Sequence, residues 1–154
     1  MKKLWPLLLI MLLGAVLLGA CQAQQKNSEA ATIDDEITKA QSIAVVSADS
    51  GETLFVLEEQ ADIENFINHL RLEEWQYTTL PENAVRETVF ILSQEDTQLL
   101  GEDEKDGALH YVGSITTYRQ LSYLSFEIAG LSFVFQIPDE ASQYLRELGA
   151  NSAG

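Results

Sequence analysis

"SYLSFEIAGLSFVFQIPDEASQYLREL", at residues 122–148, holds the clearest structural signal in this sequence. Two β-rich runs, 122–128 and 131–137, flank Ala129-Gly130, a pair that favours a tight hairpin turn. Pro138 follows and suits the first turn of a helix. Apolar residues then recur at helical spacing: Ala141, Tyr144, Leu145 and Leu148. The stretch therefore predicts a β-hairpin that leads into an amphipathic helix.

A second stretch with the same organisation lies earlier in the chain. Residues 54–70 align without gaps with residues 132–148, at a separation of 78 positions. The β-rich runs 42–48 and 52–57 form a hairpin candidate here, and the helical stripe after them consists of Ile63, Phe66, Ile67 and Leu70. Either an internal repeat or the shared physics of a strand that leads into a helix explains the match, and both explanations stay open.

Further strand candidates connect these two stretches. They are residues 74–80, 86–94, 97–102 and 109–115, while 116–120 is ambiguous. Each helical stripe carries four apolar side chains, and burial of each is worth roughly 1.5–3 kcal/mol. We therefore expect an α+β fold: one antiparallel sheet of five to seven strands, built from hairpins, with two amphipathic helices, about 61–71 and 138–148, packed on it.

The N-terminus has the features of a secretory signal. Lys2 and Lys3 precede an apolar run from Leu4 to Ala20, which ends at Cys21, the one cysteine of the chain. The run is shorter than the roughly 20 residues that a membrane-spanning helix needs. We therefore expect residues 1–20 to be a signal peptide.

The tetrapeptide Leu18-Gly19-Ala20-Cys21 resembles the lipobox of bacterial lipoproteins. This resemblance implies cleavage between Ala20 and Cys21 and a covalent diacylglycerol on the cysteine sulfur, with no other cofactor. It places the chain at the extracytoplasmic face of the cell membrane, or, because Gln22 follows, at the outer membrane in an organism with two membranes. The mature part is similar to small bacterial lipoproteins in general. A transmembrane anchor and an unmodified thiol after an ordinary signal are the alternatives.

Composition predicts the organisation of the mature chain. Residues 21–41 form a polar, acidic segment that is typical of a flexible linker, with a short helical piece near 33–40. A single domain over 42–149 and a disordered tail over 150–154 follow. Removal of Lys2 and Lys3 leaves seven basic residues against 24 acidic ones, a net charge of −17. Such a surface repels phosphate, which excludes nucleic acid as a partner. The charge indicates solubility and spacing from an anionic membrane, with a cationic partner or bound cations as the alternative.

Residues that could carry chemistry are few. His69 is expected on the helix surface and His110 in a strand, and one cysteine provides no zinc-binding spacing. The acidic stretch "EDEKDG" at 102–107 resembles an EF-hand loop in part, but Gly113 stands where the loop needs its last glutamate, so a hairpin turn is predicted instead. The sequence thus predicts no catalytic residue, no metal site and a non-enzymatic protein.

Trp75 and Tyr77 are the candidate partner contacts, because they stand two positions apart in a strand candidate. Alternatively, they cover the end of the preceding helix. We expect a lipid-anchored binding module for an envelope protein or a cationic partner, in an oligomeric state that the sequence leaves open. The spacing of its two strand-to-helix units resembles the beta-lactamase inhibitor proteins, which implies an inhibitor-like variant. The alternatives are a hydrolase or another carboxylate- or histidine-based envelope enzyme, using His110, and a cation-binding surface module.

Overall fold

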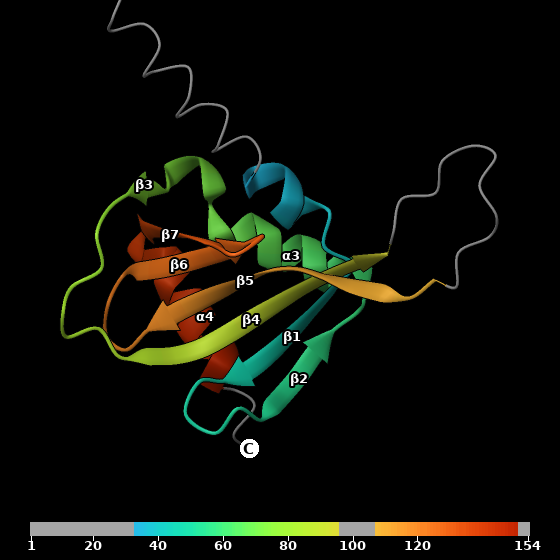
Figure 1. The fold of residues 1–154 in the computed structure, drawn as a ribbon, viewed down its shortest axis with the longest axis horizontal. Coiled ribbons are helices and arrows are strands. Elements are labelled where there is room, and N and C mark those ends of the chain that lie inside the picture. Colours follow the sequence, from blue (N-terminus) through green and yellow to red (C-terminus); the bar gives the residue numbers. More distant parts are fainter. Residues whose placement is uncertain (1–32, 96–106, 151–154) are drawn as a thin grey trace, which may run out of the picture. The chain divides into compact units, whose positions relative to one another are not determined.

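The computed structural model describes residues 33–95 and 107–150 (Figure 1). The chain divides into two units, Met1–Asp35 and Glu36–Gly154, and the fold described below belongs to the second. Within the described residues, no helix combines the length and the apolar character that crossing a bilayer requires.

One antiparallel sheet of seven strands forms the framework, in the order β2-β1-β4-β5-β6-β7-β3 (Figure 1). The strands are β1 (Ser42–Ser47), β2 (Thr53–Leu57), β3 (Gln76–Tyr77), β4 (Arg86–Glu95), β5 (Leu109–Tyr118), β6 (Tyr123–Ile128) and β7 (Leu131–Gln136). Buried and less buried positions alternate along β4, because successive side chains of a strand point to opposite faces. The predicted α+β class and single antiparallel sheet are confirmed.

Two strands differ in length from the prediction. The candidate at 74–80 narrows to the two residues of β3. Conversely, β5 continues through most of the ambiguous segment 116–120, because Thr116 and Thr117 are buried and β-branched residues fit a pleated strand. The candidate at 97–102 lies outside the described residues.

The described ranges contain three α-helices, whereas the sequence predicts two. Helix α3 (Gln60–Leu70) and helix α4 (Asp139–Ala150) are the expected pair. The third covers residues 33–38, where a short helical piece was expected inside the linker. Ile37 and Ala40, which lie inside the segment 21–41 that the sequence assigns to a linker, are buried.

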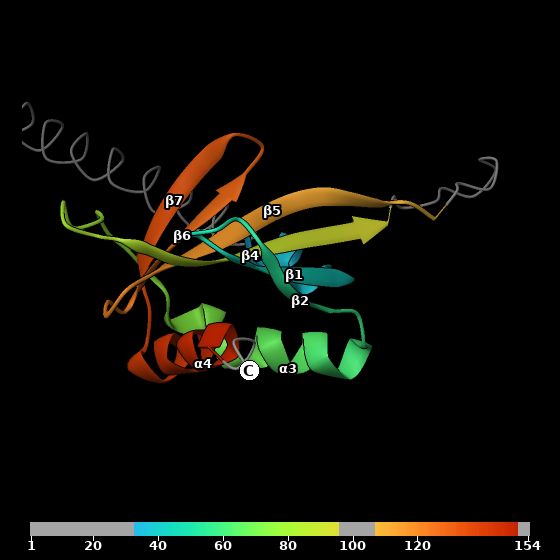
Figure 2. The same cartoon turned by 90° about the horizontal axis from the view of Figure 1, so that it is seen from below.

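Both of the aligned stretches of the sequence form a strand followed by a helix. Strand β2 leads into α3, and strand β7 leads into α4. Figure 2 shows the two helices on the same side of the sheet. Phe66 of α3 lies 5.3 Å from Phe90 of β4 and 6.4 Å from Tyr144 of α4, measured between ring centroids. Phe66 and Phe90 are completely buried and mark the centre of the core.

A glycine turn and a glycine inside a strand shape the sheet from β5 to β7. Ala129 and Gly130 both have positive φ values, 50° and 79°, as a two-residue type I′ turn requires, and they connect β6 to β7. Gly113 lies opposite Ile128 in the β5–β6 pair. A Cβ atom at Gly113 would stand 2.7 Å from the backbone oxygen of Glu127, so the two strands approach too closely for any side chain.

Candidate functional site

Four aromatic side chains gather where β3 pairs with β7, at one edge of the sheet. Trp75 and Tyr77 lie 5.1 Å and 4.5 Å from the ring of Phe135, and Tyr77 lies 6.3 Å from Phe133. Such separations are typical of favourable aromatic pairs. We call these four residues the aromatic edge. In the structure, both predicted contact residues, Trp75 and Tyr77, therefore pack against Phe135 of β7.

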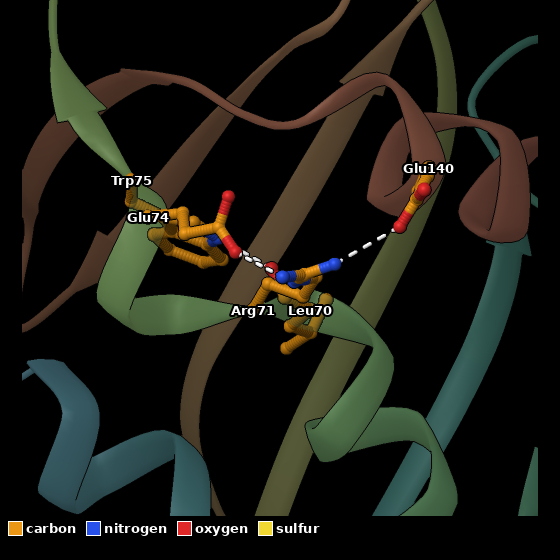
Figure 3. A network of polar contacts seen from close by, with 5 residues as sticks. All are labelled: Leu70, Arg71, Glu74, Trp75 and Glu140. Atoms are coloured by element: carbon orange, nitrogen blue, oxygen red, sulfur yellow. Dashed lines mark hydrogen bonds and ion pairs between the residues drawn. The ribbon is translucent and has the colours of Figure 1, made fainter.

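The two predicted residues differ in their environment. Trp75 is half-buried, and its Nε1–H donates a 2.7 Å hydrogen bond to the backbone oxygen of Leu70, the last residue of α3 (Figure 3). This contact satisfies one of the carbonyl groups that a helix leaves unpaired at its C-terminus. Trp75 thus covers the end of the helix, as the alternative reading of the sequence holds. Tyr77 remains 38% exposed and is the accessible aromatic of the pair.

Arg71 makes the chain turn from α3 toward the aromatic edge. Its backbone is left-handed, with φ 51° and ψ 53°, a conformation that commonly ends helices but favours glycine. A short 3-10 helix, Leu72–Glu74, follows and leads to Trp75. The left-handed residue and the 3-10 turn therefore fix the path by which the two aromatic residues reach β7.

The guanidinium group of Arg71 pairs with Glu74 and, at 2.9 Å, with Glu140 at the start of α4 (Figure 3). The charge of Glu74 raises the pKa of Arg71 most, and Glu140 acts in the same direction. All three side chains are substantially exposed, so solvent screens these pairs and they orient the corner between α3 and α4 more than they stabilise it.

An open surface cavity of about 350 Å³ lies at the same corner. Its lining residues are Asn68, His69, Arg71 and Glu140. The His69 ring stacks on Tyr144 with centroids 4.2 Å apart, and its Nδ1 atom is 2.8 Å from the backbone oxygen of Asn65. His69 is exposed, as the sequence predicts. Sequence spacing alone gave no indication that it meets Arg71 and Glu140 in one cavity.

Tyr144 provides a pH-dependent contribution to stability. Burial raises the pKa of its phenol above the ordinary value of 10.0, the hydrogen bond with the Asn65 side chain lowers it, and the charge of Asp62 raises it. The unfolded chain therefore loses this proton at lower pH than the folded chain does. The contribution is complete below about pH 10 and is lost as the pH rises through the folded pKa.

We predict that Tyr144→Phe removes this part of the alkaline loss of stability. Urea midpoints measured from about pH 8 to about pH 11 would show a flatter profile for the variant than for the unmodified chain. Tyr111→Phe, at an exposed tyrosine, is the matched control. Identical alkaline slopes for Tyr144→Phe and the unmodified chain would contradict the assignment.

The other positions singled out in the sequence lie away from the aromatic edge or outside the described residues. Ala20 and Cys21 lie outside the described residues, as does all of 102–107 except Gly107. His110 is exposed on β5, opposite Gln94 of β4. In residues 33–95 and 107–150, no group of three or more His, Cys, Asp or Glu side chains is placed to hold a metal ion.

Sequence reasoning missed two members of the aromatic edge, Phe133 and Phe135. Their spacing of two places them on one face of β7, and this spacing was visible in "SFVFQ". The pairing of β3 with β7 had no local signal, because β4, β5 and β6 lie between these two strands in the sequence. No protein-family model, curated protein or solved structure matches the chain.

Proposed function

We propose that this chain is a non-enzymatic binding module, held at the extracytoplasmic face of a membrane by a diacylglycerol on Cys21, and that it contacts its partner through the aromatic edge. The observation that carries the binding role is Tyr77, which is exposed at the edge of the sheet and rests on Phe133 and Phe135. Exposed aromatic side chains on a rigid support are typical contact residues of protein interfaces.

The anchor is supported by the sequence features around Cys21. Two acyl chains hold a protein firmly at a bilayer, whereas one chain gives marginal binding. Intact-mass measurement of the native protein should find the diacylglycerol on a chain that begins at Cys21. Cys21→Ser should move the protein from the membrane fraction to the soluble fraction. A bare thiol in the native protein would contradict the anchor and leave the binding role untouched.

The proposal includes the expected packing of both helices, about 61–71 and 138–148, on one face of the sheet. The contact of Phe66 with Phe90 supports it for the first helix, and the burial of Ala141 and Leu145 supports it for the second. Helices on one face leave the edge at β3 and β7 accessible to a partner.

We predict that Tyr77→Ala reduces partner capture at least fivefold. Cells that produce the full-length protein would be treated with a cross-linker, and the captured envelope proteins would be quantified by mass spectrometry. Tyr111→Ala is the matched control, because Tyr111 is also an exposed tyrosine on a strand but lies on β5, away from the aromatic edge. Equal capture by the two variants would overturn the role of the aromatic edge.

A further inference from the structure

Part of β7 has an unpaired outer side. Strand β3 pairs with β7 only at Gln136 and Phe135, and the last contact is the hydrogen bond from the backbone N–H of Thr78 to the backbone oxygen of Val134. Within the described part of the chain, no strand accompanies Leu131–Phe133 on that side. We call these three residues the open edge of β7.

The backbone of the open edge is oriented for strand pairing. Because Val134 directs its carbonyl toward β3, Ser132, two residues earlier, directs its own N–H and C=O to the same side. These groups point away from β6, and so they can accept an added strand. An edge of this kind is a template for pairing with another polypeptide.

The two faces of the open edge differ in chemistry. Leu131, which is 60% exposed, and the half-buried Phe133 lie on the same face as Tyr77. Ser132 and Glu127 are paired on the opposite face, and both are exposed. Figure 2 shows the β6–β7 hairpin extending away from α3 and α4, which explains why Leu131 is accessible.

Charge around the open edge indicates the kind of partner. The whole chain has a formal net charge of −15, and Glu127 of β6 stands opposite Ser132 of the open edge, whereas Glu74 and Glu140 lie beyond the other end of β7. Arg71 pairs with both Glu74 and Glu140, so one positive charge faces two negative ones there, and Glu127 makes no ion pair within the described part of the chain. A cationic segment is therefore attracted here, whereas a second copy of this acidic chain is repelled.

We propose that the open edge of β7 binds an extended, basic segment of another protein by strand addition, with an apolar–basic–apolar pattern in the three residues that face it. The apolar residues would lie beside Leu131 and Phe133. The basic residue would lie beside Ser132, whose short side chain leaves room for a lysine or arginine to reach Glu127, two strand spacings or roughly 10 Å away. This inference rests on the proposed binding role and specifies its partner.

The test uses the full-length acylated protein in a non-ionic detergent and a fluorescein-labelled peptide of alternating valine and lysine. Fluorescence anisotropy should show saturable binding that weakens several-fold as salt is raised from about 0.05 to about 0.3 M. A valine–glutamate peptide should not bind. A valine–lysine peptide with N-methylated backbone has the same charge but lacks the pairing donors, and it should bind at least tenfold more weakly.

Ser132→Pro is the decisive variant, because it removes the outward N–H at an edge-strand position, where proline is tolerated. It should weaken binding at least tenfold, while Ser132→Ala, which keeps the N–H, should stay within about twofold. In the unmodified protein, amide hydrogen exchange at residues 131–134 should slow when the peptide binds, and this measurement holds even if Ser132→Pro fails to fold.

Four results would overturn the inference. Equal binding of the N-methylated peptide would show attraction by charge alone, and slowed exchange at β2 instead of residues 131–134 would place the site at the other edge. Sedimentation that shows dimers abolished by Ser132→Pro would make a second copy the occupant. The fourth result is that the peptide fails to bind the unmodified protein while Tyr77→Ala still loses capture of envelope proteins. That combination would exclude the basic, extended segment as the partner and leave the proposed binding function standing.

Discussion

Phe66→Ala is expected to lower the free energy of unfolding by about 3–5 kcal/mol. The side chain is completely buried and contacts a ring of the sheet, Phe90, and a ring of the other helix, Tyr144. Truncation to alanine removes the hydrophobic transfer energy of the ring and leaves a cavity between α3 and β4. The neighbouring aromatic rings are held by their own strands and helix, so they can fill the cavity only in part.

Chemical denaturation followed by circular dichroism would measure the effect as a shift of the midpoint. Phe66→Leu keeps most of the volume and should cost about 1–2 kcal/mol. Asn68→Ala, at an exposed position of the same helix, controls for changes in helix propensity. A loss below about 1 kcal/mol for Phe66→Ala would show that α3 contributes little to the core.

Gly113→Ala is expected to cost about 3 kcal/mol, at the upper end of the range for overpacked sites. The new Cβ would stand 2.7 Å from the backbone oxygen of Glu127 and 3.2 Å from the ring of Phe126. The ring could move, but the backbone oxygen belongs to β6, which pairs along most of its length with β5. Relief of the clash therefore requires the two strands to separate.

A double variant distinguishes the two sources of the clash. If the backbone oxygen dominates, Gly113→Ala combined with Phe126→Leu should be no more stable than the sum of the two single changes predicts. Thermal unfolding of the four proteins in this cycle gives the comparison. Rescue by Phe126→Leu would show that the ring, and not the strand spacing, requires glycine at this position. Ser114→Ala, at the neighbouring half-buried residue, should be close to neutral.

Local patterns predicted most of the fold. The Ala129-Gly130 turn, the alternating strands on either side of it and the apolar stripe of α4 are signals contained within a few residues, and each element formed where expected. The helix at residues 33–38 was assigned to the linker because acidic residues dominate its composition, so the burial of Ile37 could not be recognised locally. The length of strand β3 was overestimated, because the β-rich residues of the candidate 74–80 extend beyond the two that pair with β7.

The candidate site was predictable in its residues and not in its arrangement. Trp75 and Tyr77 were identifiable as aromatics spaced by two, but their roles diverge because only Trp75 reaches the end of α3. That contact depends on the left-handed backbone of Arg71, a residue with no sequence signal for this conformation. The open edge depends on how far β3 follows β7, and this length is set by tertiary contacts between segments that lie far apart in the sequence.

The strand order has a consequence for how the chain folds. Strands β4, β5, β6 and β7 are consecutive both in the sequence and in the sheet. Each can therefore pair with the strand before it through closure of a local loop. Only β1 and β3 must find partners far along the chain. We therefore expect the β4–β7 meander to form early in folding, and the open edge of β7 to be present before β3 pairs with one end of it.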